Sequence, residues 1–179
     1  FFDVATLESH PRLWEILVRD FGPDRQGRGL HPEVHPANAF IGNMLRLEAL
    51  ARAGLAQEVL DESVARLHAM GERTGTLWEN THDRASCNHG FVASHVCHAF
   101  IRDLVGVRVL DRAARRVRLR FPAAALEWCE GSMPTPEGPI RVSWRQRGAN
   151  ALAYSISAPP GYDVEVEHTP GLQLEQDSI

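Results

Sequence analysis

The sequence predicts a chain of two parts, a helical part followed by an all-β part, with the change near residue 105. Before that point the apolar residues recur with a period of about 3.6, as in amphipathic helices. After Gly106 they alternate with basic and polar residues, as in half-buried strands. We therefore expect about four helices within residues 1–105 and a small antiparallel β-sandwich within residues 106–179.

The first helix is expected from about Leu7 to Phe21, because its apolar residues fall on one face. Pro11 fits only the first turn of a helix, Thr6 or Ser9 is the candidate cap, and Gly22-Pro23 ends it. The loop from Asp24 to Pro36 contains His31 and His35, and long irregular connections often line a site.

Two further helices are expected from Asn38 to Ala53 and from about Ala56 to Met70. The first is apolar over more than half of its circumference, so we expect it to be largely buried. Gly54 and Gly71 are the predicted end residues of the two helices. Because the link between them is so short, they should be antiparallel neighbours in an αα-hairpin.

A fourth helix is expected from about Asn88 to Leu104, ending at Gly106. The strand pattern then runs through six short segments, which start at Val107, Val117, Leu126, Ile140, Ala151 and Tyr162. Residues 169–179 are polar, and we expect them to fray.

Composition excludes some classes of protein. The chain has 179 residues, of which 44% are hydrophobic, and a net charge of −4 with both signs interspersed. A core is therefore possible, and a nucleic-acid partner is not expected. No apolar run approaches the roughly 18–20 residues of a membrane span, so no membrane partner is expected either. Because the chain begins Phe1-Phe2-Asp3 without Met, we expect it to be a segment of a longer protein or a processed product.

The segment from Gly75 to Leu104 carries the candidate site. Trp78 offers a flat apolar face for a pyranose ring, and Glu79 offers a general acid or base whose pKa a neighbouring indole would raise. Asn88 and His89 can hydrogen-bond to sugar hydroxyls. This combination predicts a sugar-binding pocket. The structural alternatives are a buried Trp, a carboxylate bonded to backbone N–H groups, and an Asn88 that only caps its helix.

Other polar residues give weaker signals. His82 and Asp83 lie in the intervening loop, where solvated side chains are the default. His95 and His98 have a spacing that can bind a metal, but no second ligand pair with zinc-like spacing is present, so we interpret them as core or supporting residues and expect no metal. Cys87, Cys97 and Cys129 do not form a disulfide framework; they slightly favour the cytoplasm but leave the compartment undecided.

Several segments occur in a specific order: Ala49-Leu-Ala-Arg-Ala-Gly, Thr76-Leu-Trp-Glu, Ser86-Cys-Asn-His-Gly, Gly106-Val, Pro134-Thr-Pro-Glu-Gly-Pro-Ile-Arg-Val-Ser-Trp and Pro159-Pro-Gly. In this order they resemble the C-terminal half of bacterial α-L-rhamnosidases. These are glycoside hydrolases built on an (α/α)6 barrel with a C-terminal β-sandwich. The resemblance covers about residues 36 to 168.

The resemblance implies that residues 1–105 are the C-terminal part of the catalytic barrel and residues 106–179 the C-terminal β-sandwich domain. It implies hydrolysis of terminal α-L-rhamnosides with inversion, with Glu79 as the general base. His89 would contact the sugar, Trp78 would line the pocket, and Asn88 would be a cap or supporting group. No cofactor is implied.

The chain departs from the family in two respects. The general acid of the family lies in the first half of the barrel, which is absent from this sequence, so the missing N-terminal half is an expected partner and the chain alone should be inactive. The loop between Glu79 and His89 is also shorter than in the family, and Cys87 precedes Asn88. The identity of the sugar that the enzyme binds is therefore left open. The alternatives are an (α/α)6 glycosidase for another sugar, such as an α-L-fucoside, and a non-catalytic carbohydrate-binding or assembly module.

Overall fold

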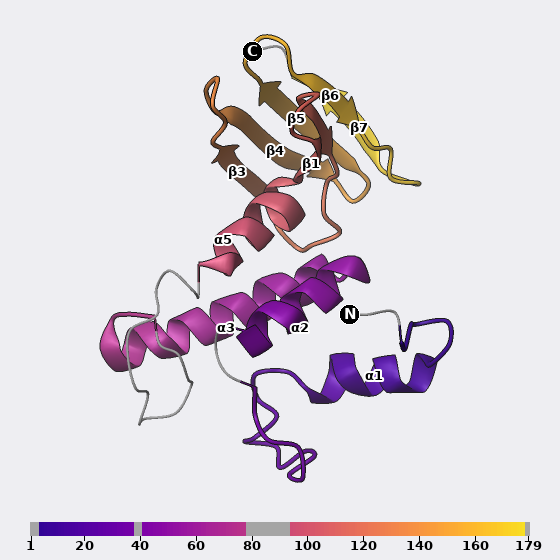
Figure 1. Ribbon diagram of the computed structural model, residues 1–179. Helices are drawn as coiled ribbons and strands as arrows, with labels where there is room; N and C mark the ends of the chain where they lie inside the picture. Colours follow the sequence, from indigo (N-terminus) through magenta and orange to yellow (C-terminus); the bar gives the residue numbers. More distant parts are fainter. Residues whose placement is uncertain (1–3, 38–40, 78–93, 178–179) are drawn as a thin grey trace. The chain divides into compact units, whose positions relative to one another are not determined.

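The computed structural model describes residues 4–37, 41–77 and 94–177 (Figure 1). The chain divides into two compact units, Phe1–Val96 and Cys97–Ile179, which we call the helical unit and the strand unit. Each unit is described by itself. Within the described ranges, no helix combines the length and the apolar character needed to cross a bilayer.

The first helix, α1 (Pro11–Asp20), begins later than predicted. Pro11 occupies the first turn as expected, but neither Thr6 nor Ser9 caps the helix, because the N-cap residue is His10 and it makes no side-chain cap bond. Thr6 and Ser9 instead bond to each other: the Thr6 N–H donates to Ser9 Oγ at 2.9 Å, and the Ser9 N–H donates to Thr6 Oγ1 at 3.1 Å. The two side chains that looked like caps therefore close a separate turn before the helix.

Helices α2 (Ile41–Arg52) and α3 (Ala56–Thr74) form the predicted hairpin (Figure 1). Gly54 adopts a φ of +77°, so it provides the left-handed residue that was expected at the turn. The core between the helices contains Leu47, Leu50 and Val59, each at most 1% exposed. The prediction that α2 is largely buried was wrong in part, since Ile41, Met44 and Leu45 are exposed by 51%, 37% and 38%. Val64 on α3 is also exposed.

Helix α3 is longer than the sequence suggested. Gly71 was predicted to end it but lies inside the helix, which continues to Thr74. Gly75 is the true end residue, with a φ of +68° and its N–H bonded to the Gly71 carbonyl at 2.9 Å. Two glycines four residues apart were both candidates, and the side-chain pattern alone does not decide between them.

The predicted fourth helix is described from Ser94 onwards. It consists of α5 (His95–Phe100) and a π-helical segment, η1 (Ile101–Val105). Gly106 ends it as predicted, with a φ of +96° and its N–H bonded to the Ile101 carbonyl. The left-handed backbone at position 106 favours Gly. A side chain would also clash there, because a Cβ would lie 2.6 Å from the Arg120 carbonyl oxygen.

Seven strands form two sheets in the described part of the strand unit. The three-stranded sheet has the order β1 (Val107–Asp111), β2 (Arg116–Leu119), β6 (Asp163–Val166). The four-stranded sheet has the order β3 (Trp128–Met133), β4 (Ile140–Gly148), β5 (Ala151–Ser157), β7 (Gln173–Gln176). Side chains from both sheets share one core, so the arrangement is sandwich-like, with Leu119, Ile140 and Trp144 buried in the middle.

Two expectations about the strands were wrong. Both sheets are mixed rather than antiparallel, because β6 pairs parallel with β2 and β7 pairs parallel with β5. Residues 169–179 do not simply fray, since β7 lies among them. The Gln173 and Asp177 N–H groups donate to the carbonyls of Asn150 and Tyr154, both at 2.8 Å, and Leu174 packs against the core. This strand is stabilised by partners distant in sequence, which a local pattern does not reveal.

Candidate functional site

The sequence-predicted site residues Trp78, Glu79, Asn88 and His89 lie outside the described residues, as do His82, Asp83 and Cys87. Their geometry is therefore not part of the structure. What the structure describes is how the chain enters this segment at the end of α3 and how it continues into α5.

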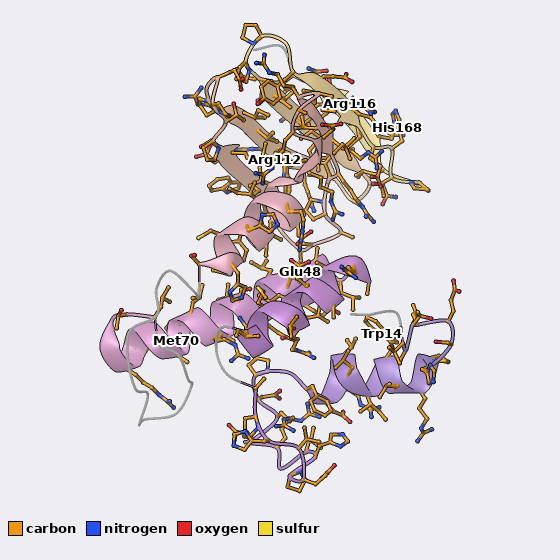
Figure 2. The ribbon with its side chains drawn as sticks, in the orientation of Figure 1. Trp14, Glu48, Met70, Arg112, Arg116 and His168 are labelled. Carbon is orange, nitrogen blue, oxygen red and sulfur yellow. The ribbon has the colours of Figure 1, made fainter. Side chains whose placement is uncertain are left out.

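The entry is fixed by the end of α3. The left-handed Gly75 turns the chain out of the helix directly before Thr76 and Leu77, and so four residues before Glu79. A residue with a side chain is disfavoured in this conformation, which explains why a Gly precedes the Thr-Leu-Trp-Glu motif. Met70, on the last buried turn of α3, is 4% exposed and anchors this end of the helix in the core (Figure 2).

The continuation is fixed by a contact between α2 and α5. Asn43 Nδ2 lies 3.2 Å from His95 Nε2, and Asn43 is only 5% exposed. In this contact the Asn43 amide nitrogen is the donor and His95 Nε2 is the acceptor. Asn43 Oδ1 is buried and has no hydrogen-bond partner within the described ranges. Sequence reasoning missed Asn43; the only signal was an Asn in the middle of an apolar helix.

A buried ion pair stabilises the hairpin that carries these residues. The Arg46 guanidinium bonds both Glu62 oxygens, at 2.7 and 2.5 Å, and also donates to the Leu17 and Val18 carbonyls at the end of α1. Bidentate guanidinium–carboxylate pairs of this kind fix geometry as well as charge. Nearby, burial lowers the pKa of Arg66, an effect that Glu62 opposes.

The His31 loop is held by its own structural contacts. Asp20, 7% exposed, lies 3.1 Å from His31 Nε2, and hydrogen bonds from Arg19 and His31 lower the pKa of Asp20 to about 2. The buried Arg25 donates to the carbonyls of His31 and Val34. These groups are engaged in closing the loop, which favours a structural role for it.

The remaining candidates do not assemble into a second centre. His95 contacts Asn43, whereas Cys97 is exposed. Within the described ranges, no group of three or more His, Cys, Asp or Glu side chains is arranged to hold a metal ion. Burial, assisted by the charge of Glu130, raises the pKa of the Cys129 thiol, which makes it a poor nucleophile near neutral pH.

Two comparisons with known proteins found a match. The family model described as the bacterial alpha-L-rhamnosidase C-terminal domain matches residues 106–175. A solved GH78 family rhamnosidase of Bacillus sp. GL1 is similar in structure, with a TM-score of 0.77 and 24% sequence identity. That match covers 97% of this chain and 18% of the other chain, so this chain spans under a fifth of that protein's length. The comparison with curated proteins finds no match.

The two matches support different conclusions. At 24% identity the likeness to the solved rhamnosidase shows the fold alone, whereas the family model identifies the strand part directly. Together they confirm the resemblance that the ordered motifs predicted. Residues 106–175 therefore match the bacterial α-L-rhamnosidase C-terminal domain, in a chain whose fold is similar to part of a GH78 rhamnosidase.

Proposed function

We propose that this chain is part of an inverting glycoside hydrolase that removes terminal α-L-rhamnosyl residues, with Glu79 as its general base. The observation that carries the proposal is the family match of the strand part, combined with the Thr76-Leu-Trp-Glu motif in the unit that precedes it. Residues 1–105 would be the C-terminal part of an (α/α)6 barrel, and residues 106–179 the C-terminal β-sandwich domain.

The exposed apolar residues of the hairpin support an incomplete barrel. Ile41, Met44 and Leu45 on α2 and Val64 on α3 are between 37% and 53% exposed. Contiguous exposed apolar side chains usually mark a surface that another element covers. In the proposed enzyme, helices of the N-terminal half of the barrel would cover them, and that half would also supply the general acid.

The chemistry assigns a separate role to each site residue. Glu79 would take a proton from a water molecule as that water attacks the anomeric carbon, while the general acid protonates the departing oxygen. Inversion requires space for the water, so the two carboxyl groups should lie roughly 6.5–9.5 Å apart. The indole of Trp78 would contact the apolar face of the sugar and His89 would bond a hydroxyl. Asn88 would cap the following helix or support His89.

Glu79→Gln in the intact enzyme tests this assignment. The amide keeps the size of the side chain but cannot accept the proton, so we expect turnover of nitrophenyl α-L-rhamnoside to fall by at least about 10²-fold. The thermal unfolding temperature should not change. Glu72→Gln is a matched control, because Glu72 is an exposed carboxylate on α3. Near-wild-type turnover by Glu79→Gln would contradict the proposal.

The sugar is tested with a panel of nitrophenyl glycosides that includes the α-L-fucoside. Hydrolysis of the rhamnoside by the intact protein, and none by the 179-residue chain, is the expected result. Faster hydrolysis of the fucoside would support the assignment as a glycosidase but would make an α-L-fucoside its substrate. No hydrolysis of any glycoside, with sugar binding retained, would favour a non-catalytic carbohydrate-binding module.

A further inference from the structure

One row of residues crosses the outer face of the four-stranded sheet. Trp128 on β3 pairs with Arg145 on β4, Arg145 pairs with Ala153 on β5, and Ala153 pairs with Glu175 on β7. Directly paired residues point to the same face, so the four side chains form a line across the sheet. This face is opposite to the core, because the neighbouring residues Trp144 and Tyr154 point inward. With strands about 4.8 Å apart, the line spans roughly 14 Å.

Exposure differs between the ends of the row and its middle. Trp128 is 55% exposed, which is unusual for so large an apolar side chain, and Arg145 and Glu175 are exposed as well. Ala153 is only 2% exposed, so neighbouring side chains cover it. On the same face, Ser143 and Ser155 bond to each other through their hydroxyls at 2.8 Å.

The polar groups of the row have no partner among the residues that the structure describes. Arginines of the other sheet are paired: Arg116 with Asp163, and Arg118 with both Glu165 and Glu167. In contrast, the side chains of Arg145, Glu175 and the adjacent Glu130 have no hydrogen-bond or ion-pair partner in the described part of the chain. The Arg145 guanidinium is also not among the cation–π contacts of that part. As far as the described residues go, the indole and its neighbouring donor and acceptors are therefore exposed and without a partner.

We propose that this row, Trp128–Arg145–Ala153–Glu175, binds a pyranose unit of a carbohydrate. The weakly positive C–H face of the ring would lie against the negative face of the indole. The Arg145 guanidinium can donate to two neighbouring hydroxyls at once, and Glu175 can accept from a further one. The surface is in the strand unit and does not depend on Glu79, so this inference goes beyond the proposed function.

A protein partner fits the row less well. Protein interfaces of standard size bury about 800 Å² on each side and have an apolar centre depleted of charge. Here a single indole is surrounded by exposed charged and hydroxyl side chains, including Glu130 and Ser132. A sugar, which has a small apolar face and many hydroxyls, matches that mixture.

Affinity electrophoresis of the intact protein in native gels tests the proposal. The gels contain rhamnogalacturonan, arabinoxylan or xyloglucan, and the protein carries Glu79→Gln so that it does not degrade the gel. We expect at least one polysaccharide to retard the protein, and Trp128→Ala and Arg145→Ala to raise its dissociation constant at least about tenfold. Leu110→Ala and Arg112→Ala are matched controls on the other sheet, at its β1 strand and the following turn, and should not alter it (Figure 2).

A further variant and three possible results decide whether the row binds a sugar. Trp128→Phe keeps an aromatic face and should retain part of the affinity, which separates loss of stacking from loss of folding. Retardation that is unchanged in Trp128→Ala, or no retardation by any of the three polysaccharides, would overturn the proposal. So would a Trp128→Ala protein that loses only self-association in size-exclusion chromatography. Because the variants are compared in one shared Glu79→Gln background, a difference in retardation reports binding at the row, whereas a wrong assignment of Glu79 would show as turnover of nitrophenyl α-L-rhamnoside by that background.

Discussion

Gly131 on β3 lies in close contact with the π-helical segment at the start of the strand unit. A Cβ at this position would lie 2.6 Å from Val105 Cγ2 and 3.4 Å from Val105 Cγ1. Val is stiff at χ1, and Val105 is 5% exposed, so it has little room to move away. We expect Gly131→Ala to destabilise the strand unit by about 1–3 kcal/mol, the usual cost of overpacking a core. Chemical denaturation measures this.

A second-site change tests the cause. If the loss comes from the clash, Val105→Ala should relieve it, so Gly131→Ala/Val105→Ala should be more stable than the sum of the two single changes predicts. Additive losses would show that Gly131 is needed for another reason, such as its backbone conformation. Gly148→Ala is a suitable control, because a Cβ at Gly148 meets no atom within 4 Å.

Single residues show which structural features the local sequence can predict. Pro11, Gly54 and Gly106 could be placed from the sequence because each has a backbone requirement that does not depend on distant partners. Asn43 could not, since its contact with His95 joins residues 52 positions apart. The chemistry of Trp78 and Glu79 was likewise deduced from residue type, and it stays a prediction.

At the scale of one element, the two glycines of α3 make opposite predictions. Gly71 is inside the helix with no atom within 4 Å of a Cβ, so Gly71→Ala should stabilise the protein by about 0.5–1 kcal/mol. Gly75 has a φ of +68°, so Gly75→Ala should destabilise it by about 1–2 kcal/mol. Denaturation midpoints of the two variants check both signs. The same sign for both would place the end of α3 elsewhere than at Gly75.

Periodicity predicted the type of most elements but not all of their pairings. Helices α1 to α3 and strands β1 to β6 were expected from apolar spacing, because each buries a face that its own residues define. The parallel strand β7 was not, since only Leu172 and Leu174 contribute apolar surface and its hydrogen bonds go to β5, some 20 residues earlier. The polar capping expectation for α1 failed for a local reason, because Thr6 and Ser9 bond each other.

At the scale of the whole molecule, the chain has two separate sets of stabilising contacts. In the helical unit, Leu47, Leu50 and Val59 form the buried centre and the Arg46–Glu62 pair ties the helices together. In the strand unit, the shared core of the two sheets is supplemented by Asp103, which is buried and paired with Arg102 and Arg108. The family model covers only strand-unit residues, so that unit is recognisable without the helices.

Two such units should unfold as two cooperative transitions in calorimetry of the 179-residue chain. Glu62→Ala leaves Arg46 buried without its carboxylate, so it should lower the transition of the helical unit, at a cost of about 3–5 kcal/mol. Gly131→Ala should lower the transition of the strand unit by roughly 4–8 °C for each kcal/mol lost. Each variant should leave the other transition in place. A single transition that both variants lower together would mean that α5, which crosses the boundary at Val96, couples the units into one folding unit.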